Sequence, residues 1–339
     1  MFAGRRAPEP ASGRPAKEDS VALLLRESEV ERLLDMPTAL EAVEEVLRQH
    51  GQGQAPNQPR RRVFVPGGVL HVMSGGMPGW GVMGLKAYAA VKGKVRFVVL
   101  LFSTETGELL ALLEADRLGQ IRTGAASGVA TKYMARADAG VVGIFGTGWQ
   151  AQTQLQAVCA VRKIREVRVY GRDADRRKRF SADMEKRLGR AVRPVDSPEQ
   201  VVKGADIVVT ITSSKEPVFD GRLVEPGQHL NVAGSNTAQK REVDDEAIRR
   251  ADRIVVDQIE DARIESGELV GPVERGITGW DRMHELGAVV CGKVPGRARP
   301  DEITLFKSNG LAIEDVAAAW KVLERARAQG AGTEVPMFS

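Results

Sequence analysis

The segment from residue 141 to 170 constrains the fold more than any other part of the chain. It reads as an apolar strand (141–145), a glycine-containing turn, a helix (149–161) and a second strand (166–170). Strands that alternate with helices predict a parallel sheet covered on both faces. The alternation continues with a helix at 173–188 and further strands at 206–212, 229–233, 253–257 and 303–306, with helical pieces expected at 194–200, 244–250 and 258–265.

The turn after the first of these strands carries a dinucleotide-binding pattern, Gly146-Thr-Gly148-Trp-Gln-Ala151. Gly146 permits the tight turn, Gly148 lets the backbone approach a pyrophosphate, and Ala151 is small enough for close packing of helix on strand. The free N–H groups of the helix start favour phosphate. We therefore predict a Rossmann-type, doubly wound α/β domain over residues 121–310.

The end of the second strand bears on the choice between the two nicotinamide cofactors. An acid at this place accepts a hydrogen bond from the ribose, whereas an arginine accommodates a 2′-phosphate. Here the tip is Gly171, followed by Arg172 and Asp173. This favours NADP(H), with NAD(H) as the alternative if Asp173 reaches the ribose instead of capping the next helix.

The remainder of the chain predicts a separate α+β unit, formed by residues 21–120 and 311–339. A strand at 21–25, helices at 27–34 and 38–50, with Thr38 as the cap of the second, and a closing helix at 311–329 are expected. Between them lie short strand candidates rich in Val, Phe and Leu at 62–65, 69–73, 84–91, 97–102 and 109–113.

Composition excludes several other classes of protein. Forty-nine Lys and Arg against 45 Asp and Glu give a net charge of +4 without a long basic block, so no nucleic-acid partner is indicated. The sequence contains no apolar run of about 18 residues, so no membrane span is predicted. Two cysteines form no disulfide framework and no metal motif, which indicates the cytoplasm. Residues 1–20 are expected to form a disordered tail.

Three cations beside apolar strands could converge on an anionic substrate: Arg61, Lys86 and Arg122. Guanidinium groups bind carboxylates with two donors, and an ammonium adds a point charge. Taken singly, each could equally be a surface charge. Among the four histidines, His71 interrupts an apolar strand and is the candidate for chemistry, although a histidine in such a place is more often a hydrogen-bonded core residue.

Five segments in this order resemble the ornithine cyclodeaminase/mu-crystallin family of NAD(P)-dependent enzymes. The quoted segments are Gly84-Leu-Lys86, Arg122-Thr-Gly-Ala-Ala-Ser127, the loop 146–151, Ala233-Gly-Ser-Asn236 with Lys240-Arg-Glu242, and ITLFKSNGLAIED at 303–315. The resemblance implies a Rossmann domain inserted into a substrate-binding and dimerisation domain, and a homodimer built through the N-terminal sheets. It also implies roles for two sets of residues. The positions that bind the substrate carboxylate are Arg61, Lys86 and Arg122. The cofactor contacts are Arg122, Thr123, Gly146, Gly148, Trp149, Gln150, Ala151 and Ser235. The three residues at the end of the second strand, Gly171, Arg172 and Asp173, are further candidates for cofactor binding.

Two departures from the family pattern bear on activity. Ornithine cyclodeaminases carry Asp where this chain has Ser235, and Glu where it has His71. A serine hydroxyl without an activating partner is no base at neutral pH. We therefore expect a reductase of α-imino acids or cyclic ketimines, with Lys86 polarising the substrate and His71 or a water on Ser235 supplying a proton. The alternatives are an amino-acid dehydrogenase, a cyclodeaminase with Glu242 as its acid, and a cofactor-dependent binding protein.

Overall fold

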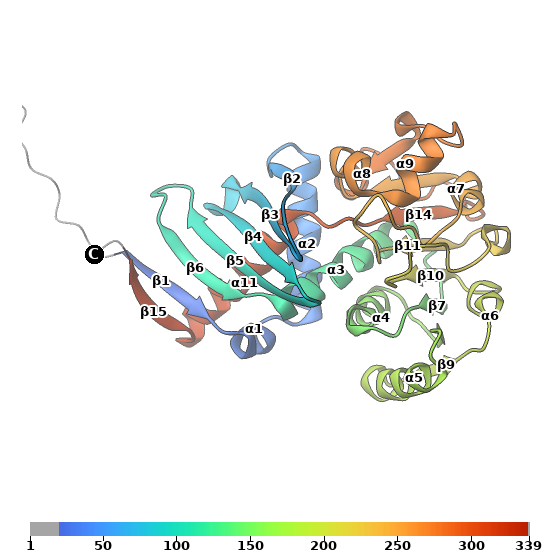
Figure 1. Ribbon diagram of the computed structural model, residues 1–339, viewed down its shortest axis with the longest axis horizontal. Helices are drawn as coiled ribbons and strands as arrows, with labels where there is room; N and C mark the ends of the chain where they lie inside the picture. The colour runs from blue at the N-terminus through green and yellow to red at the C-terminus, as the bar shows by residue number, and fades with distance from the viewer. Residues whose placement is uncertain (1–19, 338–339) are drawn as a thin grey trace, which may run out of the picture.

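The computed structural model describes residues 20–337 and contains two sheets (Figure 1). The predicted tail lies outside the described residues, except for Ser20, which begins the first strand. The first sheet, here called the mixed sheet, has the order β15 (Thr333–Met337), β1 (Ser20–Leu25), β6 (Leu109–Glu114), β5 (Lys94–Ser103), β4 (Val82–Val91), β3 (Gly68–Met77) and β2 (Asn57–Val65). Its neighbours pair antiparallel except β1 with β6.

The second sheet is parallel at every pairing found among residues 20–337, and we call it the parallel sheet. Its order is β13 (Met283–Glu285), β12 (Arg253–Val256), β14 (Thr304–Lys307), β11 (His229–Val232), β10 (Ile207–Thr210), β7 (Val141–Phe145), β8 (Glu166–Tyr170) and β9 (Ala191–Pro194). The predicted doubly wound Rossmann architecture is confirmed.

Both faces of the parallel sheet are buried. Along β10, Ile207 and Val209 belong to one hydrophobic core, whereas Val208 belongs to the core on the opposite face. This alternation follows from the two-residue period of a strand. The helices that follow or connect its strands are α4 (Trp149–Val161), α5 (Ala174–Leu188), α6 (Pro198–Val202), α7 (Asp245–Arg250), α8 (Ile259–Glu265), α9 (Gly267–Glu274) and α10 (Leu286–Val290).

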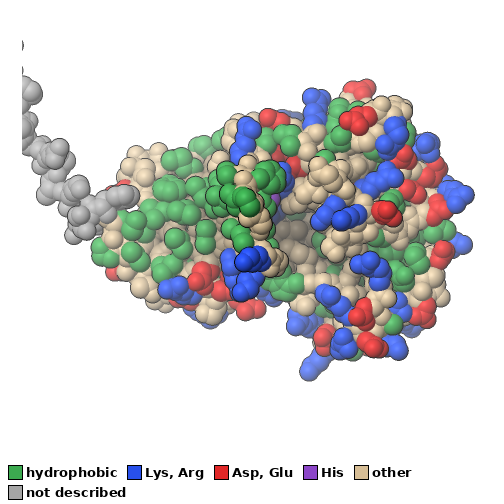
Figure 2. All heavy atoms as spheres, viewed as in Figure 1, with side chains coloured by type: hydrophobic (Ala, Val, Ile, Leu, Met, Phe, Trp, Pro, Cys, Tyr) green, Lys and Arg blue, Asp and Glu red, His purple; other side chains and the backbone are tan. Residues whose placement is uncertain are grey.

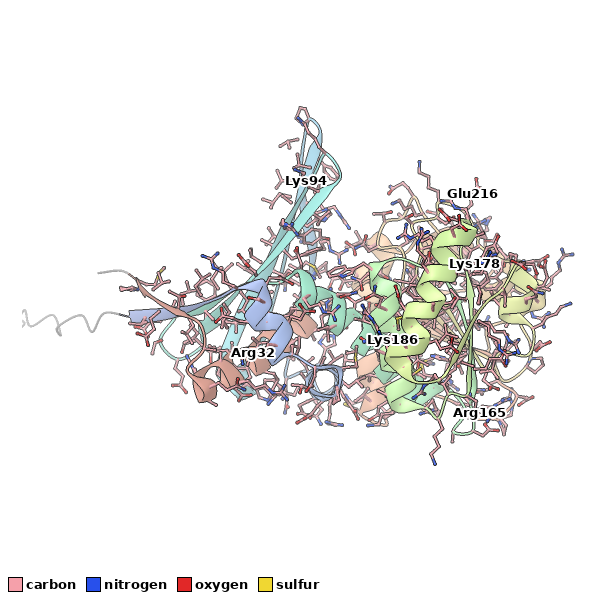
Figure 3. The ribbon with its side chains drawn as sticks, turned by 90° about the horizontal axis from the view of Figure 1, so that it is seen from below. Arg32, Lys94, Arg165, Lys178, Lys186 and Glu216 are labelled. Carbon is pink, nitrogen blue, oxygen red and sulfur yellow. The ribbon has the colours of Figure 1, made fainter. Side chains whose placement is uncertain are left out.

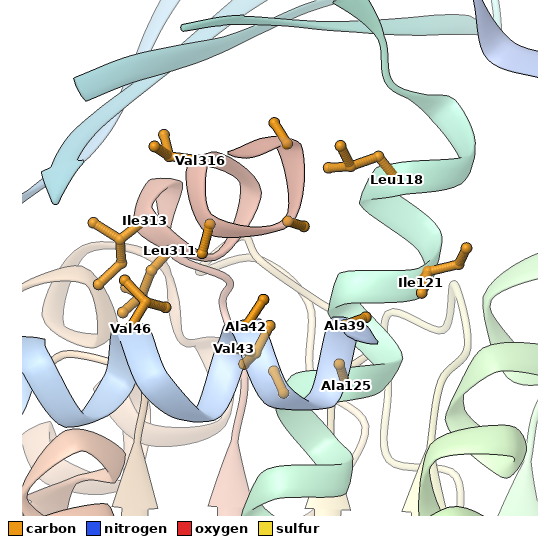
Figure 4. Packing of buried hydrophobic residues seen from close by; sticks show 14 of the residues in the cluster. Ala39, Ala42, Val43, Val46, Leu118, Ile121, Ala125, Leu311, Ile313 and Val316 are labelled. Carbon is orange, nitrogen blue, oxygen red and sulfur yellow. The ribbon is translucent and has the colours of Figure 1, made fainter. Parts of the chain in front are cut away.

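A third core joins the mixed sheet to the helices beside it, which are α1 (Glu27–Leu33), α2 (Met36–Gly51), α3 (Asp116–Met134) and α11 (Ala312–Gln329). Figure 4 shows Val46 of α2 next to Ile313 of α11, with Ala42 farther along α2 and Ile121 on the adjacent helix α3. The chain therefore leaves the first unit through α3, forms the parallel sheet, and returns through α11 to pack on the mixed sheet.

Several elements differ from the sequence expectations. Asp35, not Thr38, caps α2, because the Asp35 carboxylate accepts the Thr38 backbone N–H at 2.8 Å. The helix expected at 194–200 is instead the end of β9 followed by α6. The strands β9, β13 and β15 and the helices α9 and α10 were not predicted. They are short or contain an internal proline, as at Pro272 in α9, so local periodicity is too weak to reveal them.

The mixed sheet carries an exposed apolar surface on the hairpin strands β2 to β5. Figure 2 shows hydrophobic side chains gathered over this end of the molecule, and Figure 3 shows the hairpin that bears Lys94 extending away from the body. The large apolar side chains exposed there are Val63, Phe64, Val65, Leu70, Met83, Val91 and Val95. A search of the described helices finds none with the length and hydropathy of a membrane span.

Candidate active site

The glycine loop lies at the carboxyl end of β7 and opens a cavity of about 460 Å³. Gly146 has φ +116°, and a side chain there would overlap the Ile211 carbonyl, so only glycine fits. At Gly148, which caps α4, an added Cβ would meet only the Arg176 guanidinium, at an ordinary contact distance of 3.9 Å. The loop thus leaves backbone N–H groups accessible at a helix start, an arrangement suited to the pyrophosphate of a dinucleotide.

Basic side chains gather around the tip of β8, at the other end of this cavity. Gly171, Arg172, Asp173 and Arg176 all line it. The Asp173 carboxylate accepts the Arg176 backbone N–H at 2.9 Å, and this hydrogen bond lowers the pKa of Asp173. Asp173 is therefore the N-cap of α5, as one of the two sequence interpretations expected.

A larger cavity of about 810 Å³ lies between the mixed sheet and the carboxyl edge of the parallel sheet. Figure 2 shows the hollow between the two halves of the molecule, with Lys and Arg side chains beside it. Gln150, Ile211 and Gly234 line both cavities, so the two adjoin. The structure brings seven of the predicted residues to the larger cavity, namely Arg61, His71, Lys86, Arg122, Thr123, Gln150 and Ser235.

The other predicted cofactor residues fall into two groups. Trp149 lines the smaller cavity and is 45% exposed. Ala151 lines neither cavity; it is buried in the core between α4 and the parallel sheet. Its position agrees with the packing role given to it above and places it away from direct contact with a ligand.

Lys86 and Arg122 meet on a carboxylate that the sequence analysis did not assign. The alternation of β4 buries Val82, Gly84 and Lys86, and the Lys86 Nζ donates to Asp315 Oδ2 at 2.7 Å. Arg122 donates from Nε to Asp315 Oδ1 at 2.9 Å. Asp315 lies in the first turn of α11, where the helix dipole favours a negative charge. The shared carboxylate therefore holds an ammonium and a guanidinium side by side at the cavity wall.

Burial sets the charge of this cluster. It lowers the pKa of Lys86 to about 7, with a further contribution from the positive charge of Arg122 and opposition from Asp315. For Arg122, burial opposes the charge, but Asp315 and Glu314 outweigh it and raise the pKa. Burial also raises the pKa of Glu314 to about 8, against the attraction of Arg122, whose Nη1 donates to it at 2.7 Å. Lys86 is thus the cation that titrates near neutral pH.

The three consecutive arginines on β2, Arg60, Arg61 and Arg62, all line the larger cavity but differ in their contacts. Arg60 and Arg62 both pair with Glu265 of α8 at 2.7 Å, and Arg60 also donates to the Asn309 carbonyl. Arg61 is exposed, lines the cavity, and has no ion pair among residues 20–337. Arg60 is a cavity cation that sequence reasoning missed, whereas Arg61 keeps its donors free.

His71 stacks on Tyr88, with ring centroids 4.2 Å apart and nearly parallel planes. Burial lowers its pKa to about 4, helped by the positive charges of Arg62, Arg60 and Lys86. The imidazole is therefore uncharged at neutral pH. Its surroundings disfavour the imidazolium that the predicted role as proton donor requires.

Ser235 and Glu242 lie in the loop that connects β11 to α7. The Ser235 hydroxyl is 3.3 Å from the Thr237 carbonyl and 3.4 Å from that of Lys240. Glu242 lines neither cavity; its carboxylate accepts from Thr210, Thr212 and Gly234, and burial raises its pKa. The alternative in which Glu242 acts as the acid of a cyclodeaminase is therefore contradicted by its position.

The residues that sequence reasoning missed are mostly acids behind the cavity cations. Glu265, Glu314 and Asp315 contact the lining cations without lining the cavity themselves. Asp257 lies in the same layer and accepts the backbone N–H groups of Asn309 and Gly310. Glu314 and Asp315 end the segment ITLFKSNGLAIED, which the sequence analysis singled out. The segment by itself does not indicate which side chains these carboxylates contact.

Comparisons with known proteins agree with this geometry. The sequence model of the ornithine cyclodeaminase/mu-crystallin family matches residues 20–330. An alanine dehydrogenase of Archaeoglobus fulgidus is 36% identical over 325 residues, which cover 93% of this chain and 98% of the relative. The structure of Thermococcus litoralis Delta(1)-pyrroline-2-carboxylate reductase with NADH and L-proline superposes with a TM-score of 0.89 at 36% identity, over 92% of this chain and all of the other. An archaeal alanine dehydrogenase dimer with bound NAD gives 0.89 at 35% identity, over 94% and 100%.

Proposed function

This chain belongs to the ornithine cyclodeaminase/mu-crystallin family of NAD(P)-dependent oxidoreductases, and we propose that it reduces small α-imino acids or cyclic ketimine carboxylates to amino acids. The observation that carries the proposal is the pair of buried cations, Lys86 and Arg122, joined by Asp315 at a cavity that adjoins the glycine loop.

The cations bind and orient the substrate. Arg122 and the free guanidinium of Arg61 grip the α-carboxylate, and Asp315 holds the Arg122 side chain in position. Lys86 directs an N–H towards the C=N bond. Positioning of this kind contributes several kcal/mol to lowering the barrier.

Lys86 also supplies the proton. The C=N carbon gains a hydride and the nitrogen gains a proton, which leaves the ammonium of Lys86 as an amine. Its pKa of about 7 suits a group that gives and regains a proton near neutral pH. We assign this step to Lys86 rather than to His71, because the His71 imidazole, with a pKa of about 4, is uncharged near neutral pH. When bound, a reduced nicotinamide cofactor supplies the hydride.

The cofactor is NADPH in preference to NADH under this proposal. Backbone groups at Gly146 and Gly148 would hold the pyrophosphate, with Trp149 and Gln150 beside them in the cavity lining. Two arginines that line this cavity, Arg172 and Arg176, would bind a 2′-phosphate, and Asp173 is engaged in capping α5, which supports this choice. The related structures named above hold NADH and NAD, so the test must compare both cofactors.

We further propose a homodimer joined through the exposed apolar surface of β2 to β5. Seven large apolar side chains are exposed on these strands, and exposed apolar surface of this kind is typical of protein interfaces. The related archaeal alanine dehydrogenase is a dimer. Light scattering should therefore give twice the mass of one chain.

A panel of substrates tests the function. Oxidation of NADPH and of NADH is followed with pyrroline-2-carboxylate, piperideine-2-carboxylate, and pyruvate with ammonia or methylamine. We expect turnover of the cyclic ketimines. Tight cofactor binding without turnover of any compound in either direction would overturn the proposal and favour a binding protein.

The second candidate is an amino-acid dehydrogenase, which the alanine dehydrogenase of Archaeoglobus fulgidus supports through its 36% identity over nearly the whole chain. Efficient use of pyruvate with ammonia, and release of ammonia from alanine, would favour it. Cyclisation of ornithine is not favoured, since Ser235 is no acid and Glu242 is held behind the turn.

A further inference from the structure

The turn Ala233-Gly234-Ser235 after β11 lies where the two cavities meet. Gly234 lines both cavities, and Ser235 lines the larger one. A ligand that reaches from the glycine loop into the substrate cavity must pass this turn. Its backbone therefore lies where the reactive end of a bound cofactor would reach the substrate cavity.

One side of the turn is held by Glu242. Its carboxylate accepts from the Gly234 N–H at 2.7 Å, the Thr212 N–H at 2.5 Å and the Thr210 hydroxyl at 2.8 Å. A Cβ on Gly234 would overlap Oε1 of Glu242, so glycine is required for this close approach. Glu242 thereby ties the turn to the end of β10.

The other side is held by Lys307 at the end of β14. The Lys307 side chain has no exposed surface, and its Nζ donates to the Ser235 carbonyl at 2.5 Å. Nζ also lies 3.3 Å from Oε2 of Glu268. The other carboxylate oxygen of Glu268 accepts the Glu242 backbone N–H at 3.1 Å. Glu242, Lys307 and Glu268 thus form one buried cluster around the turn.

Burying three ionisable side chains costs free energy that an apolar core would not. The cluster is placed where it makes hydrogen bonds to two successive residues of a loop that lines both cavities. We propose that Glu242, Lys307 and Glu268 are positioning residues that hold the Gly234–Ser235 turn in the geometry needed for the nicotinamide end of the cofactor. This inference rests on the proposed function for the identity of the ligand, and it gives Glu242 a role other than that of an acid.

Two variants and one control test the proposal. Lys307→Met removes the donor to Ser235 with little change of side-chain length, and Thr210→Val removes one hydroxyl with almost no change of shape. Glu302→Gln is the control, because Glu302 is a buried acid just before the opposite end of the same strand β14 and lines neither cavity.

The measurements are the dissociation constants of NADPH and NADH by calorimetry, and amide hydrogen exchange of residues 233–236 in the protein without cofactor. We expect Lys307→Met to weaken cofactor binding by roughly tenfold to a hundredfold, the range for loss of a hydrogen bond to a charged group. Exchange at the turn should accelerate by at least tenfold. Thr210→Val should shift both in the same direction by about threefold to tenfold.

Glu302→Gln should lower the melting temperature without changing either measurement. If Lys307→Met does not fold, Thr210→Val decides the question. Folded variants with wild-type dissociation constants and wild-type exchange would overturn the proposal. Neither measurement uses a substrate, so the outcome is separate from the substrate panel that tests the proposed function.

Discussion

The substitution Asp315→Asn tests the charge cluster at the substrate cavity most directly. Asp315 is fully buried, accepts from Lys86 at 2.7 Å and from Arg122 at 2.9 Å, and is close in size to asparagine. Its carboxylate opposes the fall in the pKa of Lys86. The substitution removes this support, so Lys86 should lose its proton at lower pH than in the unaltered protein.

The magnitude follows from the contact. A hydrogen bond to a charged group contributes roughly 1.5–3 kcal/mol, and one pH unit corresponds to about 1.4 kcal/mol. In the unaltered protein kcat/KM should be high below pH about 7 and fall as Lys86 deprotonates above it. In Asp315→Asn the fall should move to lower pH by roughly one to two units, since only the protonated form donates. Lys86 would lose its ion-pair partner while Arg122 keeps Glu314, and breaking this buried pair should lower the free energy of unfolding by about 3–5 kcal/mol.

The assay is the pH profile of kcat/KM with the best substrate of the panel, together with denaturant unfolding. Asp116→Asn is the matched control: Asp116 lines the same cavity but pairs with the exposed Arg96, so its removal should leave the profile in place. An Asp315→Asn profile that coincides with that of the unaltered protein would refute the assignment of the titrating group to Lys86.

Four further predictions concern other residues of the two cavities. His71→Phe should keep the stacking on Tyr88 and leave kcat/KM within about fivefold, because the uncharged imidazole is not the proton donor. A loss of kcat/KM above a hundredfold would instead identify His71 as the proton donor. Gly146→Ala should destabilise the fold by about 1–3 kcal/mol or more, measured by unfolding, since φ is +116° and the Ile211 carbonyl is in the way. Gly148→Ala should instead leave the free energy of unfolding within about 1 kcal/mol, because its Cβ would meet only Arg176, at 3.9 Å. The same substitution should weaken cofactor binding, measured by calorimetry. Equal losses of stability at both glycines would contradict this. Arg172→Ala should reduce kcat/KM for NADPH about tenfold and leave that for NADH unchanged, and an equal loss for both cofactors would exclude a contact with the 2′-phosphate.

The sequence by itself was sufficient for the elements whose signal is local. The strand, glycine loop and helix from residue 141 to 170 have hydrophobic periods and turn residues that admit few alternatives, and the structure confirms them as β7, α4 and β8. The long helices α2 and α11 were also apparent, since apolar residues recur along them at helical spacing. The resemblance to a family was carried by the same kind of local motif.

Tertiary structure decided the features that depend on contacts between distant segments. Asp315 meets Lys86 and Arg122 from 229 and 193 residues away, and no spacing in the sequence shows that one carboxylate serves both. The strand β15 exists because it pairs with β1 at the other end of the described chain. The charge states of Lys86 and His71 likewise follow from burial and from neighbouring cations, which are properties of the packed molecule and not of the residue types.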